Sequence, residues 1–114
     1  MIGKINGTLT EIMGSDGLIE TTSGLSYWVV LPKTLGVMAL PQQVSFYTHL
    51  QVREDAHILF GFQNISQFKM FHLLLGVDGV GPKTAHTVIS YKTQDEIVTA
   101  VRMQDISAFT SISG

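Results

Sequence analysis

The sequence contains no cysteine among its 114 residues. This absence excludes disulfide bonds and thiolate metal sites, and it fits a reducing compartment. No apolar run approaches the about 20 residues that a membrane helix needs. The first four residues lead into an alternating pattern and not into the apolar core of a signal peptide. We therefore expect a cytoplasmic protein without a membrane segment.

Charged residues are scarce, at 14% of the sequence, and they show no basic excess. With 45% hydrophobic residues, the chain is globular and fits one domain or two very small ones. The net charge is −2, with 3 basic and 5 acidic residues in positions 1–62 and 4 of each in positions 63–114. Nucleic-acid binders usually carry a basic footprint. Any DNA binding must therefore come from local geometry, from oligomerisation or from residues outside this sequence.

The first half of the sequence has the two-residue period of β-strands. Gly3, Ile5, Gly7 and Leu9 alternate with polar residues, and inward-facing glycines suit the sharply coiled strand of a small barrel. Further strands are expected at residues 18–22, 25–31, 43–52 and 58–62, with a short helix or loop at residues 32–40. This pattern favours a five-stranded oligonucleotide/oligosaccharide-binding (OB) barrel over residues 1–62, and a five-stranded SH3-like barrel is the alternative.

The same alternation predicts side-chain directions and turns. In the fourth strand, Tyr47 and His49 are expected to face outward. The inward positions of that strand are Val44, Phe46, Leu50 and Val52. Turns are expected at residues 15–17, Ser-Asp-Gly, and at residues 23–24, Ser-Gly.

Residues 63–114 have the pattern of a small all-α domain, so the predicted fold class is α+β. Asn64 and Gln67 form an expected capping pair ahead of an apolar helix face made by Phe68, Phe71, Leu74 and Leu75. Thr93 followed by Glu96 is a capping box. Asp105 is expected to cap a last short helix that runs through residues 109 and 112.

The segment Gly79-Val80-Gly81-Pro82-Lys83 joins two apolar helical runs and resembles the hairpin of helix-hairpin-helix DNA-binding modules. Two glycines around one apolar residue make a tight turn that can take positive φ. Pro82 suits the first position of a helix, where no N–H is needed. Amides around Gly79, Gly81 and Lys83 could hold one anionic oxygen, with Lys83 adding a positive charge. An ordinary connection between two helices is the alternative.

An acidic loop, Arg53-Glu54-Asp55-Ala56, lies between the fourth and fifth expected strands. Taken alone, adjacent carboxylates at a hairpin tip are usually a solvated turn. The surrounding runs at residues 47–50, 52–57 and 59–62 closely resemble a stretch of the bacterial RuvA family. Residues 1–3, residues 7–9 and the hairpin match as well, so the resemblance covers the whole chain.

The resemblance implies the DNA-binding subunit of the RuvAB complex, which migrates four-way (Holliday) junctions in recombination and repair. It implies a flat homotetramer, single or paired, that holds an open junction for the RuvB helicase motor, needs no cofactor and is not itself catalytic. Glu54 and Asp55 match the family's acidic pin, which separates the crossing strands. The family's first hairpin grips the DNA backbone and reads no bases, and its positions are matched by Gly79, Val80, Gly81, Lys83 and Thr84.

The chain departs from the family pattern near residue 114. The family has a second hairpin of the form Pro-Gly-apolar-Gly-Lys-Lys, and here only its first glycine, Gly114, is reached. Ser113 stands where a proline is common, and the family's third domain, which contacts the RuvB motor, has no counterpart in these residues. The expectation is therefore a truncated N-terminal part of the subunit, with Gly114 as a DNA-binding residue.

Two other functions stay open. A nuclease could bind Mg²⁺ through Glu54 and Asp55, but adjacent loop side chains point apart and no third carboxylate is spaced to join them. A general single-strand DNA-binding protein could stack bases on Tyr27 and Trp28, although both aromatics also fit the core or a subunit interface.

Nothing in the sequence points to a metal site or to nucleotide hydrolysis. The glycine-rich hairpin is too short for a nucleotide-hydrolase phosphate loop. The histidines lack metal-ligand spacing and are expected at surface or half-buried positions: His49, His57, His72 and His86.

Overall fold

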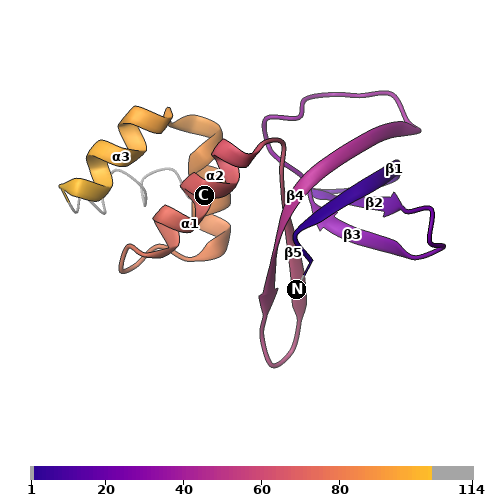
Figure 1. The fold of residues 1–114 in the computed structure, drawn as a ribbon, viewed down its shortest axis with the longest axis horizontal. Coiled ribbons are helices and arrows are strands. Elements are labelled where there is room, and N and C mark those ends of the chain that lie inside the picture. The colour runs from indigo at the N-terminus through magenta and orange to yellow at the C-terminus, as the bar shows by residue number, and fades with distance from the viewer. Residues whose placement is uncertain (1, 104–114) are drawn as a thin grey trace. The chain divides into compact units, whose positions relative to one another are not determined.

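The computed structural model describes residues 2–103, which form five strands followed by three helices (Figure 1). The strands are β1 (Lys4–Met13), β2 (Asp16–Glu20), β3 (Ser26–Val30), β4 (Gln42–Val52) and β5 (His57–Phe62). The helices are α1 (Ile65–Leu75), α2 (Pro82–Tyr91) and α3 (Gln94–Arg102). The chain divides into two compact units, Met1–Ile65 and Ser66–Gly114, and each is described by itself.

The five strands close into a barrel in the order β1-β2-β3-β5-β4, with β4 returning to β1. β3 and β5 pair in parallel, whereas every other neighbouring pair is antiparallel. A simple meander would pair all its neighbours antiparallel, so the parallel pair marks the Greek-key crossover of an OB barrel. The predicted OB barrel is confirmed, and the SH3-like alternative falls away.

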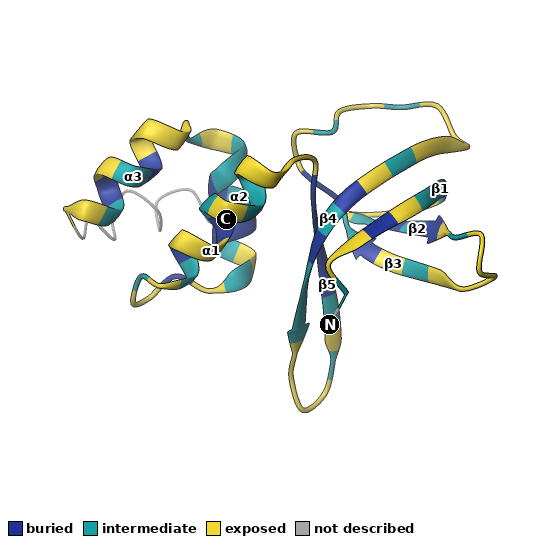
Figure 2. Ribbon diagram, in the orientation of Figure 1, coloured by how far each residue is buried: buried dark blue, intermediate teal, exposed yellow. Residues whose placement is uncertain are grey.

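The barrel core comes from the alternation read in the sequence (Figure 2). Ile5 and Leu9 of β1 are buried as predicted, and they pack in one cluster with Ile19, Val29, Leu31, Phe46 and Leu59. Gly7 is a close-approach position: a Cβ there would lie 2.3 Å from the carbonyl oxygen of Glu20. Glycine at this position therefore lets β1 and β2 come together, as expected for a strongly coiled strand.

The first turn of the β region differs from its prediction. It is at residues 14–15 and not at 15–17, because Met13 pairs with Asp16 and Gly14 has a φ of 62°. A two-residue hairpin turn favours positive φ at such a position, so Asp16 and Gly17 already belong to β2. Residues 32–40 contain neither helix nor strand, as the loop alternative predicted.

Val52 was expected inside the barrel and is 61% exposed, because β4 continues past the barrel wall there. In the same strand, Thr48 is 1% exposed although it is polar. Its hydroxyl donates a hydrogen bond of 2.6 Å to the carbonyl oxygen of Ile2, which satisfies the polar group inside the core.

The helical unit is built from short amphipathic helices whose buried side chains include Phe71, Leu74, Ala85, Val88 and Ile97, and Val80 of the connecting hairpin is buried with them. The capping box is confirmed: the Glu96 amide donates to Thr93 Oγ1 over 3.2 Å, and the Thr93 amide donates to Glu96 Oε1 over 3.0 Å. His86 corrects a prediction, because it is 2% exposed where a surface or half-buried position was expected. The helix expected after Asp105 lies outside the described residues.

Candidate nucleic-acid interface

The hairpin between α1 and α2 begins where α1 ends. The amides of Gly76 and Val77 donate to the carbonyl oxygens of Leu73 and Leu74 over 3.2 and 3.0 Å, which closes the last turn of the helix. The Val80 amide then donates to the Val77 carbonyl oxygen over 3.1 Å. With Gly79 at the third position and a φ of 88°, this is a type II turn, which requires glycine there.

Val80 holds the hairpin in place. Its side chain is 6% exposed and its amide is used by the turn, so it contributes packing and not a free donor. Gly81 differs from its predicted role, because its φ of −90° and ψ of 174° are extended and not left-handed. Gly81 is instead the N-cap residue of α2, where the absence of a side chain leaves the helix end open to a ligand.

The N-terminus of α2 presents the positive end of a helix. Pro82 occupies the first turn, as predicted, and the Ala85 amide donates a helical hydrogen bond to the Gly81 carbonyl oxygen over 2.9 Å. The amides of Lys83 and Thr84 precede that bond and have no acceptor within the helix. No acidic residue occupies the first turn, and Lys83 is exposed. The arrangement can bind one anionic oxygen through amides and a lysine.

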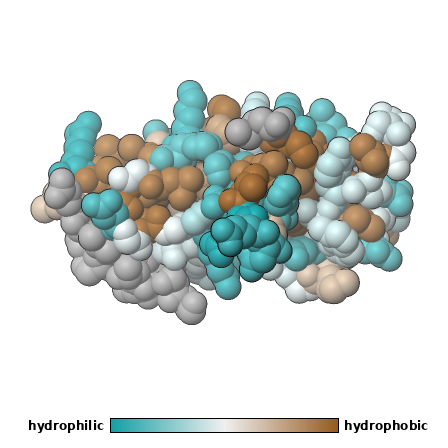
Figure 3. Space-filling view, turned by 90° about the horizontal axis from the view of Figure 1, so that it is seen from below, coloured by the Kyte–Doolittle hydropathy of each residue, from teal (hydrophilic) through white to brown (hydrophobic). Residues whose placement is uncertain are grey.

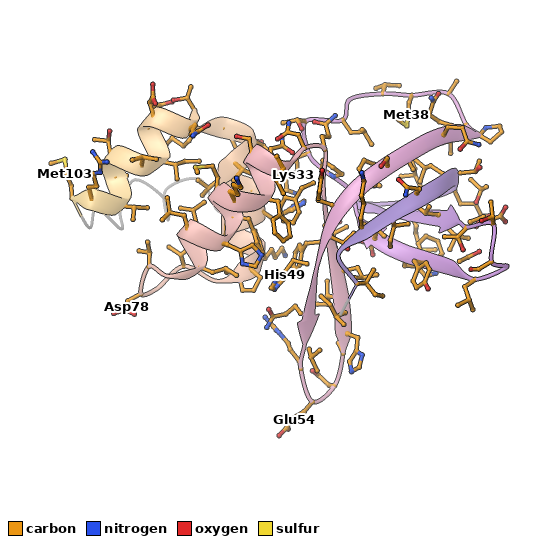
Figure 4. All side chains as sticks on the ribbon, viewed as in Figure 1. Lys33, Met38, His49, Glu54, Asp78 and Met103 are labelled. Carbon is orange, nitrogen blue, oxygen red and sulfur yellow. The ribbon has the colours of Figure 1, made fainter. Side chains whose placement is uncertain are left out.

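Asp78 is the negative charge closest in sequence to this helix end. It is exposed and takes the second position of the turn, directly before Gly79 (Figure 4). Aspartate is common at turn positions because its short side chain can hydrogen-bond to nearby backbone.

The acidic loop stands at the tip of the β4–β5 hairpin. Pairing of β1 with β4 begins at Lys4 opposite Tyr47, whereas β4 and β5 remain paired as far as Val52 and His57. The hairpin therefore runs beyond the strand that flanks it. At the tip the Arg53 amide donates to the Ala56 carbonyl oxygen over 2.8 Å.

Glu54 and Asp55 are both exposed at this tip, and the Glu54 side chain points away from the strands (Figure 4). Figure 3 looks towards the tip, where the nearest atoms are hydrophilic. Two adjacent carboxylates on a narrow projecting ribbon outnumber the single positive charge of the neighbouring Arg53, so the tip carries a net negative charge. Such a tip repels phosphate groups.

The aromatic candidates for base stacking face different ways. Tyr27 is partly buried against the barrel core, as the core alternative predicted. Trp28 is 45% exposed on the outer side of β3. Because the two side chains lie on opposite faces of one strand, they do not form a joint stacking platform.

The remaining features considered in the sequence are a metal site, a membrane span and the second hairpin. Within the described residues no three His, Asp or Glu side chains gather as metal ligands. None of the helices that the structure describes has the length and hydropathy of a membrane span. Gly114 and the start of the second hairpin lie outside the described residues.

An OB barrel that carries an acidic hairpin, followed by a helix-hairpin-helix unit, places the chain in the class of OB-fold/helix-hairpin-helix proteins. The model of the RuvA N-terminal domain matches residues 1–61. The chain belongs to this family.

Curated relatives match the chain over its whole length. It is 45% identical to a protein of Colwellia psychrerythraea, 40% identical to one of Pseudomonas syringae and 38% identical to one of a Marinomonas species. Each of these is named Holliday junction branch migration complex subunit RuvA. The matches cover 54%, 57% and 58% of those proteins, so the chain spans about half the length of the relatives it matches.

Proposed function

We propose that this chain is a structure-specific DNA-binding protein that recognises four-way junctions and holds them open for branch migration. The names of its relatives support this function, since each is a subunit of a Holliday junction branch migration complex. The chain itself acts as a non-catalytic binding subunit in the cytoplasm, and the motor activity comes from the RuvB partner.

The observation that carries the proposal is the open N-terminus of α2 behind the Gly79 turn. Its unpaired amides and Lys83 offer an anion site, and no acidic residue occupies the first helical turn. Amides and a lysine contact phosphate oxygens without distinguishing bases. The hairpin therefore supplies affinity for a DNA arm whatever its sequence, through Gly79, Gly81, Lys83 and Thr84, while Val80 anchors it.

Glu54 and Asp55 supply selection for the open junction. A carboxylate about 6 Å from a phosphate costs about 3 kcal/mol at an effective dielectric of 20, before salt screening. Strands that diverge at a junction centre can avoid this repulsion, whereas a continuous duplex cannot. The acidic tip therefore penalises duplex more than junction.

A homotetramer, single or paired, would arrange the α2 N-termini and the acidic tips around one junction. A four-way junction has four arms, and closed rotational symmetry would present one hairpin to each arm and bring four acidic tips together at the centre. Up to eight carboxylates, two from each of four copies, would then surround the crossover.

The test is a set of gel-shift titrations of the full chain with three DNA molecules: a four-way junction, a duplex of one arm sequence and oligo-dT. We expect the tightest binding to the junction, with affinity that is unchanged when the arm sequences are exchanged. Sedimentation of the same samples measures whether the junction-bound species contains four or eight copies. Preference for oligo-dT would favour the single-strand-binding alternative, and Mg²⁺-dependent cleavage that stops with chelator would favour the nuclease.

A further inference from the structure

The outer face of β1, β2 and β3 carries side chains that the proposed DNA contacts do not use. Ile19 and Val29 are fully buried, so their neighbours along β2 and β3 point outward. Strand register sets the outward residues directly opposite one another, with Glu11 beside Leu18 and Leu18 beside Trp28. We call this surface the acidic-aromatic face, and it comprises Glu11, Met13, Asp16, Leu18, Glu20 and Trp28.

The centre of the acidic-aromatic face is apolar and exposed. Trp28 is 45% exposed, and Met13, which pairs with Asp16 in the neighbouring row, is 68% exposed. Trp and Met are enriched at protein interfaces, where a large apolar side chain supplies much of the contact energy. The pair of Leu18 and Trp28 therefore offers a hydrophobic anchor point on the sheet.

Carboxylates surround this apolar centre. Glu11, Asp16 and Glu20 are outward residues on β1 and β2, and neither β2 nor β3 contains a lysine or an arginine. Lys4 lies at the far end of β1, with its Nζ 5.0 Å from the ring centroid of Tyr47 in β4. Lys33 follows β3 and lines a small cavity beside residues 14–15. The face is therefore negative around an aromatic ring.

The charge decides between possible occupants. DNA phosphates are repelled by three carboxylates, which disfavours base stacking on Trp28. A second copy that docked through the same face would oppose the same three charges, so this face does not pair with itself. A cationic protein surface meets both features, because an arginine pairs with carboxylates and also stacks on an indole ring.

We propose that the acidic-aromatic face is a docking surface for a basic, partly apolar segment of another protein. Arginine or lysine side chains pair with Glu11, Asp16 and Glu20, and an apolar side chain packs on Leu18 and Trp28. The acidic-aromatic face shares no residue with the acidic tip or the α2 N-terminus, so the proposal does not depend on DNA binding.

Trp28 is the one tryptophan of the sequence, so its fluorescence reports directly on this face. The test titrates the full chain with a synthetic eight-residue peptide of alternating Arg and Leu. We expect a saturable blue shift of Trp28 emission with this peptide, weaker binding with an Arg–Ser peptide, and no change with a Glu–Leu peptide.

The deciding variant replaces the three carboxylates by amides of the same shape, Glu11→Gln, Asp16→Asn and Glu20→Gln. We expect it to bind the Arg–Leu peptide about tenfold more weakly, because exposed ion pairs each contribute a modest amount. The control, Glu54→Gln with Asp55→Asn and Asp78→Asn, removes the same charge elsewhere and should bind within about twofold of the parent. Equal losses in both variants, an unchanged Trp28 spectrum, or saturable quenching of Trp28 by oligo-dT would overturn the proposal.

Discussion

In the proposed function, Lys83 and the pair Glu54–Asp55 act on the same ligand group, the phosphate, with opposite sign. Lys83 is exposed beside the open N-terminus of α2, so it adds a full charge to a helix end that is already positive. Glu54 and Asp55 are exposed at the tip of the β4–β5 hairpin, where their two negative charges outnumber the one positive charge of the neighbouring Arg53. At the residue scale, the proposal therefore assigns affinity and selectivity to different side chains.

Replacement of Lys83 by alanine is expected to weaken junction binding equally for all arm sequences. Each lysine that neutralises a phosphate releases counterions, so the slope of log affinity against log salt should fall in magnitude by about 1 per hairpin. Filter-binding titrations at four salt concentrations measure that slope. Lys69→Ala is the matched control, because Lys69 is an exposed lysine of α1 outside the hairpin. Equal slopes for both variants would show that the hairpin does not contact DNA.

Removal of the acidic pair is expected to tighten binding to duplex and to reduce the junction-to-duplex affinity ratio. Glu54→Gln with Asp55→Asn keeps the shape of the loop and deletes its charge, so the duplex loses a repulsion that the junction already avoids. Thermal stability should change little because both side chains are exposed. Paired titrations with junction and duplex at two salt concentrations provide the measurement. If the ratio stays unchanged, the two carboxylates are a solvated turn only.

At the scale of elements, the N-termini of α2 and α3 differ in how their amides are satisfied. α2 begins at a bare N-cap glycine, whereas α3 begins with a complete capping box. The box satisfies two amides within the chain, so the α3 N-terminus is closed to ligands. The α2 N-terminus, with Gly81 in place of a capping side chain, is the one left open for an anion. In the proposed function, α3 is therefore stabilised by its own capping box, whereas α2 offers its N-terminus to an anion.

The capping box of α3 makes stability depend on pH. The pKa of Glu96 lies below its ordinary value because its carboxylate accepts hydrogen bonds from the backbone and side chain of Thr93, and Lys92 adds positive charge. A lowered pKa in the folded state means that the charged carboxylate stabilises the fold above the unfolded pKa. This contribution disappears as the pH falls through the folded pKa.

Glu96→Gln is therefore expected to be less stable than the parent at neutral pH and to approach it below the ordinary glutamate pKa. Urea unfolding followed by circular dichroism between pH 7 and roughly pH 3 measures the difference. Asp95→Asn is a control that removes a first-turn charge outside the capping box. A stability gap between Glu96→Gln and the parent that stays constant across this range would contradict the assignment.

For the whole molecule, the two proposals place different partners on two surfaces of the same barrel. One end of the β4–β5 hairpin carries the acidic tip, and the outer side of β1, β2 and β3 carries the acidic-aromatic face. Both surfaces are negative, so neither supplies affinity for DNA. In the proposed function, binding to the junction therefore depends on the helix-hairpin-helix unit and on the number of copies assembled around the junction centre. The proposal thus reconciles a net charge of −2 with relatives named Holliday junction branch migration complex subunits.

Local patterns were enough to predict much of this protein. The alternation around Ile5 and Leu9, the box of Thr93 and Glu96, and the turn at Gly79 each depend on neighbours within a few residues, and the structure confirms them. Five strands with an interruption after the third favoured an OB barrel, and the parallel pairing of β3 and β5 then excluded the SH3-like alternative. Together with the ordered motifs, these features indicated the family from the sequence.

Only the tertiary structure decided which faces are covered. Period-two alternation separates two sides of a strand but does not say where the barrel wall ends, so Val52 was expected inside and is exposed. Thr48 shares the inward period of Phe46 and Leu50, but only the structure shows the hydrogen bond to the Ile2 carbonyl oxygen that satisfies its buried hydroxyl. His86 is buried on α2, where a surface or half-buried position was expected. The acidic-aromatic face likewise appears only when strand register sets Glu11, Leu18 and Trp28 side by side, since register is a property of paired strands.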